Sequence, residues 1–274
     1  MSRDFRFSVL MSVYHKETPA FLHQAMASLF AQTLKADEFV LVADGPLTQE
    51  LDEVIQRYAT VHPELNIVRL AKNVGLGNAL NEGMKHCTMP WIARADSDDV
   101  NDPTRFQRQI DRLREDPKIV VLGTDIDEFD QDPALPRHVK HMPTSNEQIL
   151  QSIKTRNPIN HMSVMFHRES IISVGSYQHL PYVEDYYLWA RVAANQMKIE
   201  NLGEVLVHAR VGNGMVARRG NKAYIKSWSV LGKYMVSKGM ITPMGFVKNM
   251  VLITGFVWMP VWLKSFVYQH ILRR

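Results

Sequence analysis

The first hundred residues alternate between short apolar runs and segments whose apolar residues recur at helical spacing. The apolar runs have the length and continuity of strands buried on both faces, and they cover residues 5–14, 38–45, 66–70 and 91–96. The segments between them are predicted helices, at residues 19–31, 48–61 and 75–87. Pro19 suits the first turn of one helix and Thr48 the N-cap of another. This β-α-β-α-β-α-β order predicts a parallel sheet covered by helices.

The pattern is less regular beyond residue 100. It predicts further elements, namely helices at 102–116 and 183–196 and strands at 119–129, 163–169 and 205–211. Residues 130–147 are rich in Pro, Asp and His and are expected to form a loop or lid. We expect an α/β domain over residues 1–222, followed by a basic and apolar helical region over residues 223–274.

Composition is that of a folded globular protein, with 46% hydrophobic and 22% charged residues among 274. Cys87 is the single cysteine, which excludes an intrachain disulfide, and no Cys/His cluster indicates a structural zinc site. The first apolar run is short and ends in charges, so it is interpreted as a strand and not as a signal peptide. These features favour a cytoplasmic protein.

Charge is distributed unevenly along the chain. Residues 205–274 hold eleven of the 32 Lys and Arg residues and none of the 28 Asp and Glu residues. The first 204 residues therefore combine 21 basic with 28 acidic groups, a net charge of −7. An acidic body with a purely basic tail predicts a separate partner for the tail, either an anionic membrane surface or nucleic acid.

The C-terminal segment 244–274 is apolar but too short in its uncharged part to span a bilayer. Fifteen uncharged residues separate Lys248 from Lys264, whereas a spanning helix needs about 20, and Pro260 interrupts them. Aromatic residues of the kind enriched at membrane interfaces lie among the cations: Trp258, Trp262 and Tyr268. A helix lying in the membrane interface is favoured over a core-packing hairpin and over a true span.

An acidic turn follows the fourth predicted strand. In "ARADSDDV", Asp96 comes where that strand ends, and Tyr14 and Asp44 take the same place after the first and second strands. Ligands bind at the carboxyl ends of parallel strands. The spacing of Asp96 and Asp98 suits Mg²⁺ or Mn²⁺, whose ligand shell diphosphate oxygens can complete. The alternative is an ordinary solvated acidic turn.

Two other clusters carry candidate chemistry. Glu184 and Asp185 fall at a helix start, where they serve either as first-turn acids or as a carboxylate that accepts a proton. Arg218 and Arg219, downstream of Arg210, suit a phosphate-rich ligand or a solvated basic loop.

A dinucleotide site is not supported by "GLGNALNEG". The third glycine of the G-x-G-x-x-G pattern would fall at Leu80, and the segment does not close a tight turn after its strand.

Seven segments, taken together in chain order, resemble one known family. They are "SVLMSVYHKE", "VLVADGP", "NVGLGNALNEG", "IARADSDD", "NPINHMSVMF", "VGSY" and "VEDYYLWARV". Over roughly residues 6–220 the chain resembles the family 2 glycosyltransferases of bacterial surface-polysaccharide synthesis (O-antigen, capsule or exopolysaccharide). The resemblance implies the GT-A fold, a Rossmann-like, mostly parallel sheet flanked by helices, with a C-terminal amphipathic helical segment that associates with membranes. It also implies an inverting transfer from a nucleotide-sugar donor, usually UDP-Gal, UDP-Glc or UDP-GlcNAc.

The resemblance assigns roles residue by residue. The expected nucleotide contacts are Ser12, Tyr14, Asp44, Asn73, Arg94, Asp96, Arg218 and Arg219. Asp96 and Asp98 become the ligands of Mn²⁺ or Mg²⁺, and Asp99 a residue of the turn. Asp185 becomes the general base, with Glu184 orienting it or binding the acceptor. The expected acceptor contacts are Asn160, His161 and Trp189, although a structural histidine and a core tryptophan are the alternatives.

Two departures from the family pattern bear on these roles. The family more often has two acids before the glycine of "VLVADGP", where this chain has Ala43 and Asp44. Many relatives carry an arginine where this chain has Leu80, so Arg94, Arg218 or Arg219 would replace its contact.

The chemistry of the residues agrees with this assignment. An inverting transfer is one in-line displacement, which needs a base for the acceptor hydroxyl and charge stabilisation for the departing diphosphate. The expected acceptor is a lipid-diphosphate-linked saccharide at the inner face of the cytoplasmic membrane. Residues 240–274 would dock the enzyme there as a peripheral protein, no nucleic acid is expected, and the oligomeric state stays open.

Two competing functions share some of these sequence features. A nucleotide-sugar-forming nucleotidyltransferase needs a glycine-rich, lysine-bearing loop after the first strand, and "SVYHKETP" lacks the glycines. A non-catalytic basic module that binds membrane or nucleic acid fits the tail. The strand-end carboxylates argue against it, because they repel phosphates unless a metal intervenes.

Overall fold

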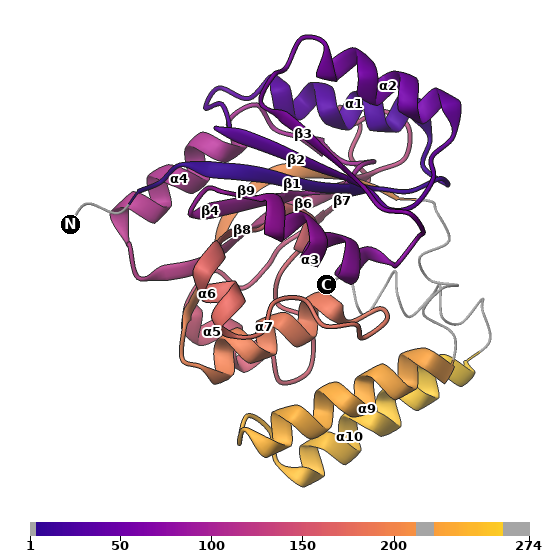
Figure 1. Cartoon of the computed structure of the whole chain (residues 1–274). Coiled ribbons are helices and arrows are strands. Elements are labelled where there is room, and N and C mark those ends of the chain that lie inside the picture. Colours follow the sequence, from indigo (N-terminus) through magenta and orange to yellow (C-terminus); the bar gives the residue numbers. More distant parts are fainter. Residues whose placement is uncertain (1–3, 212–221, 260–274) are drawn as a thin grey trace.

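The computed structural model describes residues 4–211 and 222–259, and Figure 1 shows one sheet with helices packed on its two faces. The strands are β1 Phe7–Val13, β2 Glu38–Ala43, β3 Leu65–Arg69, β4 Trp91–Ala95, β5 Val100–Asn101, β6 Ile119–Phe129, β7 His138–Lys140, β8 Met165–His167 and β9 Lys198–Arg210. The helices are α1 Pro19–Phe30, α2 Gln49–Ala59, α3 Leu76–His86, α4 Arg105–Glu115, α5 Asn146–Ser152, the 3₁₀ helix η1 His161–Ser163, α6 Arg168–Ser173, α7 Glu184–Ala194, α9 Lys222–Ser237 and α10 Pro243–Trp258.

The sheet is mixed, with strand order β3-β2-β1-β4-β8-β6-β9-β5 and β7 paired with β6. Strands β3, β2, β1 and β4 are parallel, as expected from the first hundred residues. β8 then enters between β4 and β6 and runs antiparallel to both. Strands β6 and β9 again run in the direction of β4, so that among the described strands the short β5, β7 and β8 are the antiparallel ones. The expectation of a mostly parallel sheet is therefore confirmed.

Each face of the sheet covers a separate hydrophobic core. Successive side chains of a strand point to opposite faces, so Leu10 packs with α3 and α7 while Val9 and Met11 pack with α1, α2 and α4. Burial on both faces explains why the first strands are continuous apolar runs. Cys87 is buried in the first of these cores, and this burial raises the pKa of its thiol to about 12.

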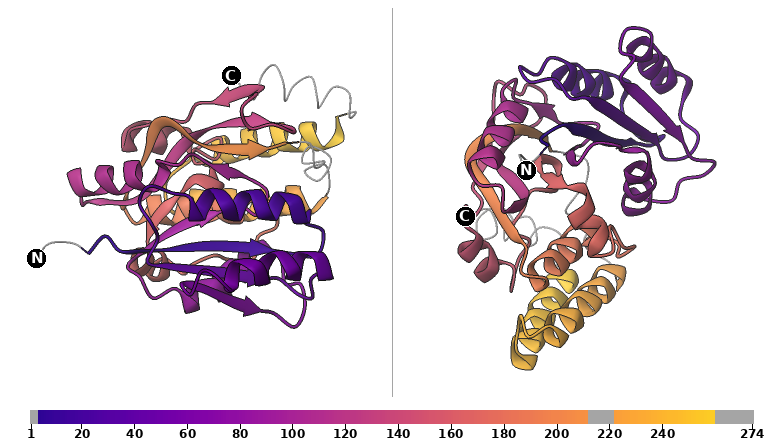
Figure 2. Two further views of the ribbon diagram at one scale, coloured as in Figure 1. Left: turned by 90° about the horizontal axis from the view of Figure 1, so that it is seen from above. Right: turned by 60° about the vertical axis from the view of Figure 1, so that its left-hand side comes forward.

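The first residues of α1 and α2 agree with the end signals in the sequence. Pro19 stands at the start of α1, and the Thr48 hydroxyl accepts a hydrogen bond from Leu51 N at 3.4 Å at the start of α2. The expected loop at 130–147 contains β7, and β9 begins at Lys198, ahead of the predicted residue 205. The two views in Figure 2 show the helices on either side of the sheet.

Helices α9 and α10 form a hairpin packed against α7 (Figure 1). Tyr186 meets Trp228 with ring centroids 5.4 Å apart, and Tyr187 meets Tyr234 at 5.2 Å. Trp228 belongs to the same core as α3 and α7. The expected boundary at residue 222 therefore marks a change in composition and not a separate core. Across residues 4–211 and 222–259, no helix has both the length and the apolarity that crossing a membrane requires.

Candidate active site

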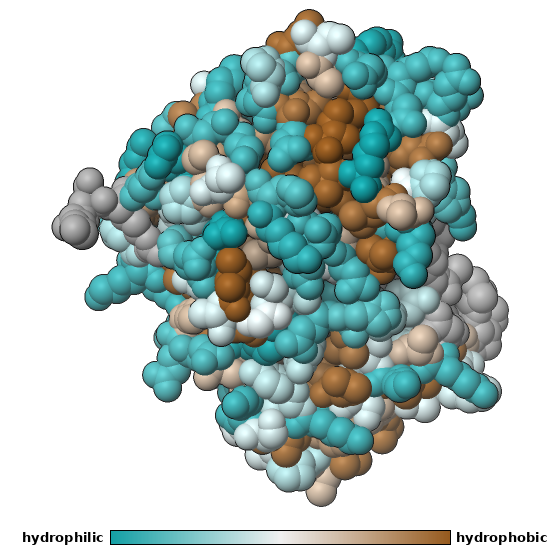
Figure 3. All heavy atoms as spheres, viewed as in Figure 1, coloured by the Kyte–Doolittle hydropathy of each residue, from teal (hydrophilic) through white to brown (hydrophobic). Residues whose placement is uncertain are grey.

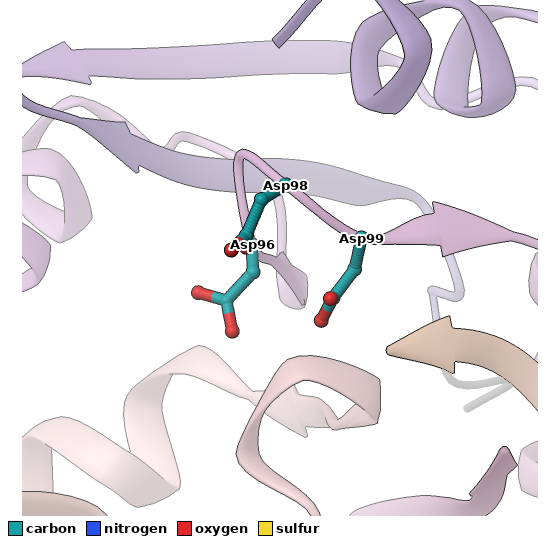
Figure 4. A group of neighbouring side chains, drawn as sticks. All are labelled: Asp96, Asp98 and Asp99. Carbon is teal, nitrogen blue, oxygen red and sulfur yellow. The ribbon is translucent and has the colours of Figure 1, made fainter. Parts of the chain in front are cut away.

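The acidic turn after β4 brings three carboxylates together. One oxygen each of Asp96, Asp98 and Asp99 lies within 4.8 Å of the others. Figure 4 shows the three side chains leaving one turn, with Asp96 and Asp99 pointing to the same side. Burial, and then the charges of Asp96 and Glu17, raise the pKa of Asp98 to about 7. Burial also raises the pKa of Asp99 well above its usual range.

The donor set of this turn fits a divalent cation. Asp99 Oδ2 is buried and accepts no hydrogen bond from any residue that the structure describes. Buried carboxylates that repel one another either take up protons or bind a cation. Mg²⁺ and Mn²⁺ prefer oxygen ligands, and this turn offers carboxylate oxygens from three neighbouring residues. Asp96 and Asp98 are the residues that would hold it.

Arg210, at the end of β9, fixes the turn from the far side. Its backbone N–H donates to Asp99 Oδ1 at 2.8 Å, and its Nε donates to the Asp98 carbonyl at 3.1 Å. The remaining guanidinium nitrogens donate to the Asp130 carbonyl at 3.0 Å and to Gln24 Oε1 at 2.5 Å. Arg210 therefore positions the acids. Arg218 and Arg219, the expected phosphate contacts, lie outside the described residues.

Arg94 lies beneath the turn, with 1% of its surface exposed, and forms an ion pair with Asp96. It was expected to contact the nucleotide, but a side chain this deeply buried instead orients Asp96. A second buried arginine, Arg105, supports the same strand end, donating to the Arg94 carbonyl at 2.8 Å and to Gln109 Oε1 at 3.1 Å. Sequence reasoning missed Arg105, which appeared there only as part of a helix.

Glu17, also missed, joins the loop after β1 to the acidic turn. Ser97 Oγ, between Asp96 and Asp98, donates to Glu17 Oε2 at 2.5 Å. The same loop carries Tyr14, whose ring is partly exposed, and follows half-buried Ser12 in β1. The expected nucleobase contacts of this loop therefore stand next to the expected metal ligands, as strand-end residues should.

Asp44 organises the loop before α3. Its carboxylate accepts hydrogen bonds from Val74 N at 2.7 Å, Gly75 N at 3.1 Å and Asn73 Nδ2 at 3.0 Å. Gly45 has φ +87°, and a Cβ there would lie 2.6 Å from Asn73 N. The Asp44 side chain is almost fully buried. The nucleobase contact expected of it would therefore compete with these three intramolecular hydrogen bonds.

The Glu184–Asp185 pair opens α7. Asn157, which sequence reasoning missed, donates from Nδ2 to Asp185 Oδ2 at 2.7 Å. Glu184 lies against α3, where a Cβ on Gly77 would be 3.2 Å from Glu184 Cγ. Burial raises the pKa of Glu184 to about 7, and the neighbouring Asp185 charge adds to the rise. Glu184 therefore keeps its proton to a higher pH than an exposed glutamate does.

Buried Tyr177 and half-buried His161 lie near both groups of acids. The Tyr177 hydroxyl is 2.7 Å from His161 Nε2. Burial raises the pKa of Tyr177; Arg94 opposes the rise, and Asp185 and Asp96 add to it. Burial, and then the Arg94 charge, lower the pKa of His161, so its imidazole is neutral. Both acid groups therefore lie within electrostatic reach of one tyrosine and belong to one site.

Two of the expected acceptor contacts, Asn160 and Trp189, are buried. Asn160 is buried, donating to the Thr124 carbonyl at 3.0 Å and accepting from Lys140 Nζ at 2.7 Å. Trp189 is 0% exposed within the core, so it offers no face to a sugar. The core alternative is correct for Trp189, and its assignment to the acceptor is wrong.

Comparisons with known proteins agree with this geometry. Residues 8–175 match the model of Glycosyl transferase family 2. The chain is 41% identical to the amylovoran biosynthesis glycosyltransferase AmsE of Erwinia amylovora, covering 96% of this chain and 98% of that protein. It is 33% identical to the UDP-Gal:alpha-D-GlcNAc-diphosphoundecaprenol beta-1,3-galactosyltransferase of Escherichia coli, covering 98% and 97%. The structure of S. aureus TarS 1–349 in complex with UDP-GlcNAc superposes with a TM-score of 0.72 at 16% identity, covering 98% of this chain and 77% of that one.

Proposed function

Because the chain belongs to glycosyl transferase family 2 and is an enzyme of polysaccharide synthesis, we propose that it is an inverting, metal-dependent transferase. Its donor is a UDP-sugar, UDP-Gal, UDP-Glc or UDP-GlcNAc, and its acceptor is a hydroxyl of a lipid-diphosphate-linked saccharide. One observation carries this proposal. Asp96 of the acidic turn and Asp185 of the Glu184–Asp185 pair both act electrostatically on the same buried residue, Tyr177.

On the donor side, Asp96 and Asp98 hold Mn²⁺ or Mg²⁺, and the loop with Ser12 and Tyr14 holds the nucleoside. A divalent cation bound by these two residues would supply positive charge to the departing diphosphate. Arg94 keeps Asp96 in place from beneath. The name of the Escherichia coli relative and the UDP-GlcNAc complex of TarS support a uridine nucleotide.

On the acceptor side, Asp185 takes the proton of the attacking hydroxyl. Asn157 orients this carboxylate through the 2.7 Å hydrogen bond, and Glu184 holds its own proton near neutral pH. The acceptor oxygen bonds to the anomeric carbon as the bond from that carbon to the diphosphate oxygen breaks. A single displacement of this kind inverts the anomeric centre.

The first experiment measures thermal stabilisation by UDP, GDP and CDP, with and without Mn²⁺, in the wild type and in Asp98→Ala. A ligand that binds only the folded state must raise its apparent stability. We expect a shift with UDP that requires Mn²⁺ and disappears in Asp98→Ala. A wild type that responds to no nucleotide would favour the non-catalytic, basic membrane- or nucleic-acid-binding module.

Residues 240–274 are proposed to dock on the inner face of the cytoplasmic membrane, and the described part of this segment supports the proposal. Helix α10 packs one apolar side on the core through Met250, Ile253 and Val257. Its other side is also apolar and exposed, with Met244 76% and Trp258 73% accessible. A helix that is apolar on both sides suits an apolar surrounding.

Charge favours an anionic bilayer as that surrounding. No acid occurs from residue 205 to the C-terminus, and lysines lie on both helices of the hairpin. Figure 3 shows hydrophobic and hydrophilic side chains mixed over the hairpin surface at the bottom of the view. Residues 260–274, which the proposal includes, lie outside the described residues.

Vesicle sedimentation tests this docking. We expect the full chain to bind vesicles that contain phosphatidylglycerol more tightly than vesicles of phosphatidylcholine alone. The double variant Val251→Asp and Trp258→Glu should lose the binding and keep its UDP response. Equal binding by this variant and the wild type would contradict α10 as the docking surface.

A further inference from the structure

Glu17 lies in the loop after β1 and contacts three parts of the chain around the candidate site. Its Oε1 accepts a hydrogen bond from the backbone N–H of Thr18, the residue before α1, at 2.8 Å. Its own backbone N–H donates to the Tyr14 carbonyl at 3.0 Å. Its Oε2 accepts a hydrogen bond from Ser97 Oγ in the acidic turn at 2.5 Å. Glu17 therefore connects the turn that carries Tyr14, the start of α1 and the acidic turn.

The hydrogen bond between Ser97 and Glu17 joins residues that are 80 positions apart in the chain. Ser97 is 6% exposed and stands between Asp96 and Asp98, the residues proposed to hold the cation. A hydroxyl that donates to a carboxylate forms a short bond, which is stronger than a bond between neutral groups. This bond therefore holds the acidic turn in a defined position relative to the loop after β1.

Glu17 has no part in the cation site or in the proton transfer of the proposed function. In the described part of the chain, the carboxylates that come within 4.8 Å of one another are Asp96, Asp98 and Asp99, and Glu17 is not in this group. Both of its carboxylate oxygens already accept hydrogen bonds from the chain itself. The structure therefore points to a role for Glu17 in the connection between two regions and not in direct contact with a ligand.

We propose that Glu17 is a positioning residue that makes nucleoside binding and cation binding cooperative. The inference rests on the proposed function, in which the loop with Tyr14 holds the nucleoside and the acidic turn holds Mn²⁺ or Mg²⁺. A nucleoside that orders this loop also holds Glu17 in place, and Glu17 then holds Ser97 between the two cation ligands. Because coupling between two binding sites is reciprocal, a bound cation favours nucleoside binding by the same factor.

Uridine is the probe that tests this coupling, because it lacks the diphosphate that would bridge the two regions directly. The dissociation constant of Mn²⁺ is measured from the electron paramagnetic resonance signal of the free ion, without uridine and with saturating uridine. The ratio of the two constants is the coupling factor. It is determined for the wild type, Glu17→Ala, Ser97→Ala, the double variant and Glu17→Gln, together with the unfolding midpoint and UDP affinity. Lys16→Ala, at an exposed position of the same loop, is the control.

In the wild type we expect uridine to tighten Mn²⁺ binding about fivefold. Glu17→Ala and Ser97→Ala should each reduce the coupling factor to about one, and the double variant should show no further loss, because either substitution alone removes the bond. Glu17→Gln keeps an oxygen that accepts from Ser97, so its coupling factor should stay above about two. Lys16→Ala should behave as the wild type.

Three results would overturn the cooperative role of Glu17, and they point to different errors. Full coupling in Glu17→Ala shows that the bond to Ser97 does not transmit it. An equal loss of coupling in Lys16→Ala, or a loss in Glu17→Gln with a lower unfolding midpoint, shows a general disturbance of the loop. A wild type that binds UDP, but whose Mn²⁺ affinity uridine leaves unchanged, rejects the coupling alone, whereas one that binds no UDP rejects the proposed function with it.

Discussion

The two acidic groups of the site are built in opposite ways. Asp96, Asp98 and Asp99 share one turn, and buried neighbours hold their like charges together. Glu184 and Asp185 are adjacent but have different surroundings, since Glu184 is half-buried against α3 and Asp185 accepts a hydrogen bond from Asn157. In the proposed function the crowded group would hold a cation, while Glu184 would keep its proton and Asp185 would accept one. Chemically identical side chains would thus serve different roles because their surroundings differ.

The largest expected effect is the loss of sugar transfer when Asp185 is replaced, without loss of UDP binding. Asp185→Asn keeps the hydrogen-bonding shape but cannot take the proton, so sugar transfer should fall about 10²–10⁴-fold. The UDP shift with Mn²⁺ should persist in this variant and vanish in Asp98→Ala. Transfer assays and thermal shifts on both variants check the division. Loss of the UDP shift in Asp185→Asn would show that the two groups are not separate in function.

The second prediction concerns Arg94, the buried ion-pair partner of Asp96. Arg94→Met removes a buried cation and leaves Asp96 without its ion-pair partner, at a cost of about 3 kcal/mol in unfolding free energy. Urea unfolding measures this loss. Arg69→Met, which breaks an exposed pair with Asp52, is the control and should cost less than about 1 kcal/mol. Similar losses in the two variants would contradict the burial argument.

The third prediction concerns the pH dependence of stability, to which each acidic group contributes one residue with a raised pKa. Burial raises the pKa of both Asp98 and Glu184 to about 7, so the folded chain holds protons that the unfolded chain has released. Stability of the metal-free protein should therefore fall as pH rises between about 4 and 7, by up to about 1.4 kcal/mol per pH unit for each group.

Mn²⁺ and Glu184→Gln should each remove one part of this slope. Mn²⁺ stabilises the ionised form of Asp98, and the substitution removes the titration of Glu184. Unfolding at stepped pH values, with and without Mn²⁺, separates the two contributions. A slope that Mn²⁺ leaves unchanged would place Asp98 away from the cation.

The smallest expected effect concerns Tyr14, the exposed tyrosine in the loop after β1. Tyr14→Ala should weaken UDP binding about tenfold, because the base loses an aromatic partner. Calorimetry with UDP and Mn²⁺ measures this affinity. Unchanged UDP binding in Tyr14→Ala would show that the ring does not meet the base.

Local sequence patterns predicted those parts of the fold that local forces determine. The strands β1 to β4 and helices α1 to α4 follow from apolar period and from end signals such as Pro19 and Thr48. β5 and β7 have two and three residues, too few to show a period, and both form by pairing with distant strands. The direction of β8 likewise depends on its neighbours.

The site divides in the same way. Asp96, Asp98 and Asp185 can be proposed from the sequence alone because neighbouring acids at the end of an element are visible there. Glu17 and Asn157 were missed because their partners lie 80 and 28 residues away along the chain. Burial, which places Arg94 and Trp189 inside the protein, also depends on the complete fold.

The location of Cys87 has a practical consequence. A protonated thiol inside the core reacts slowly with maleimides and similar reagents, because the thiolate is the nucleophile. With one native cysteine so protected, a cysteine introduced on α10, as in Val251→Cys, becomes the selectively reactive site of the whole chain. An environment-sensitive fluorophore attached there would report directly how deep the helix sits in a bilayer.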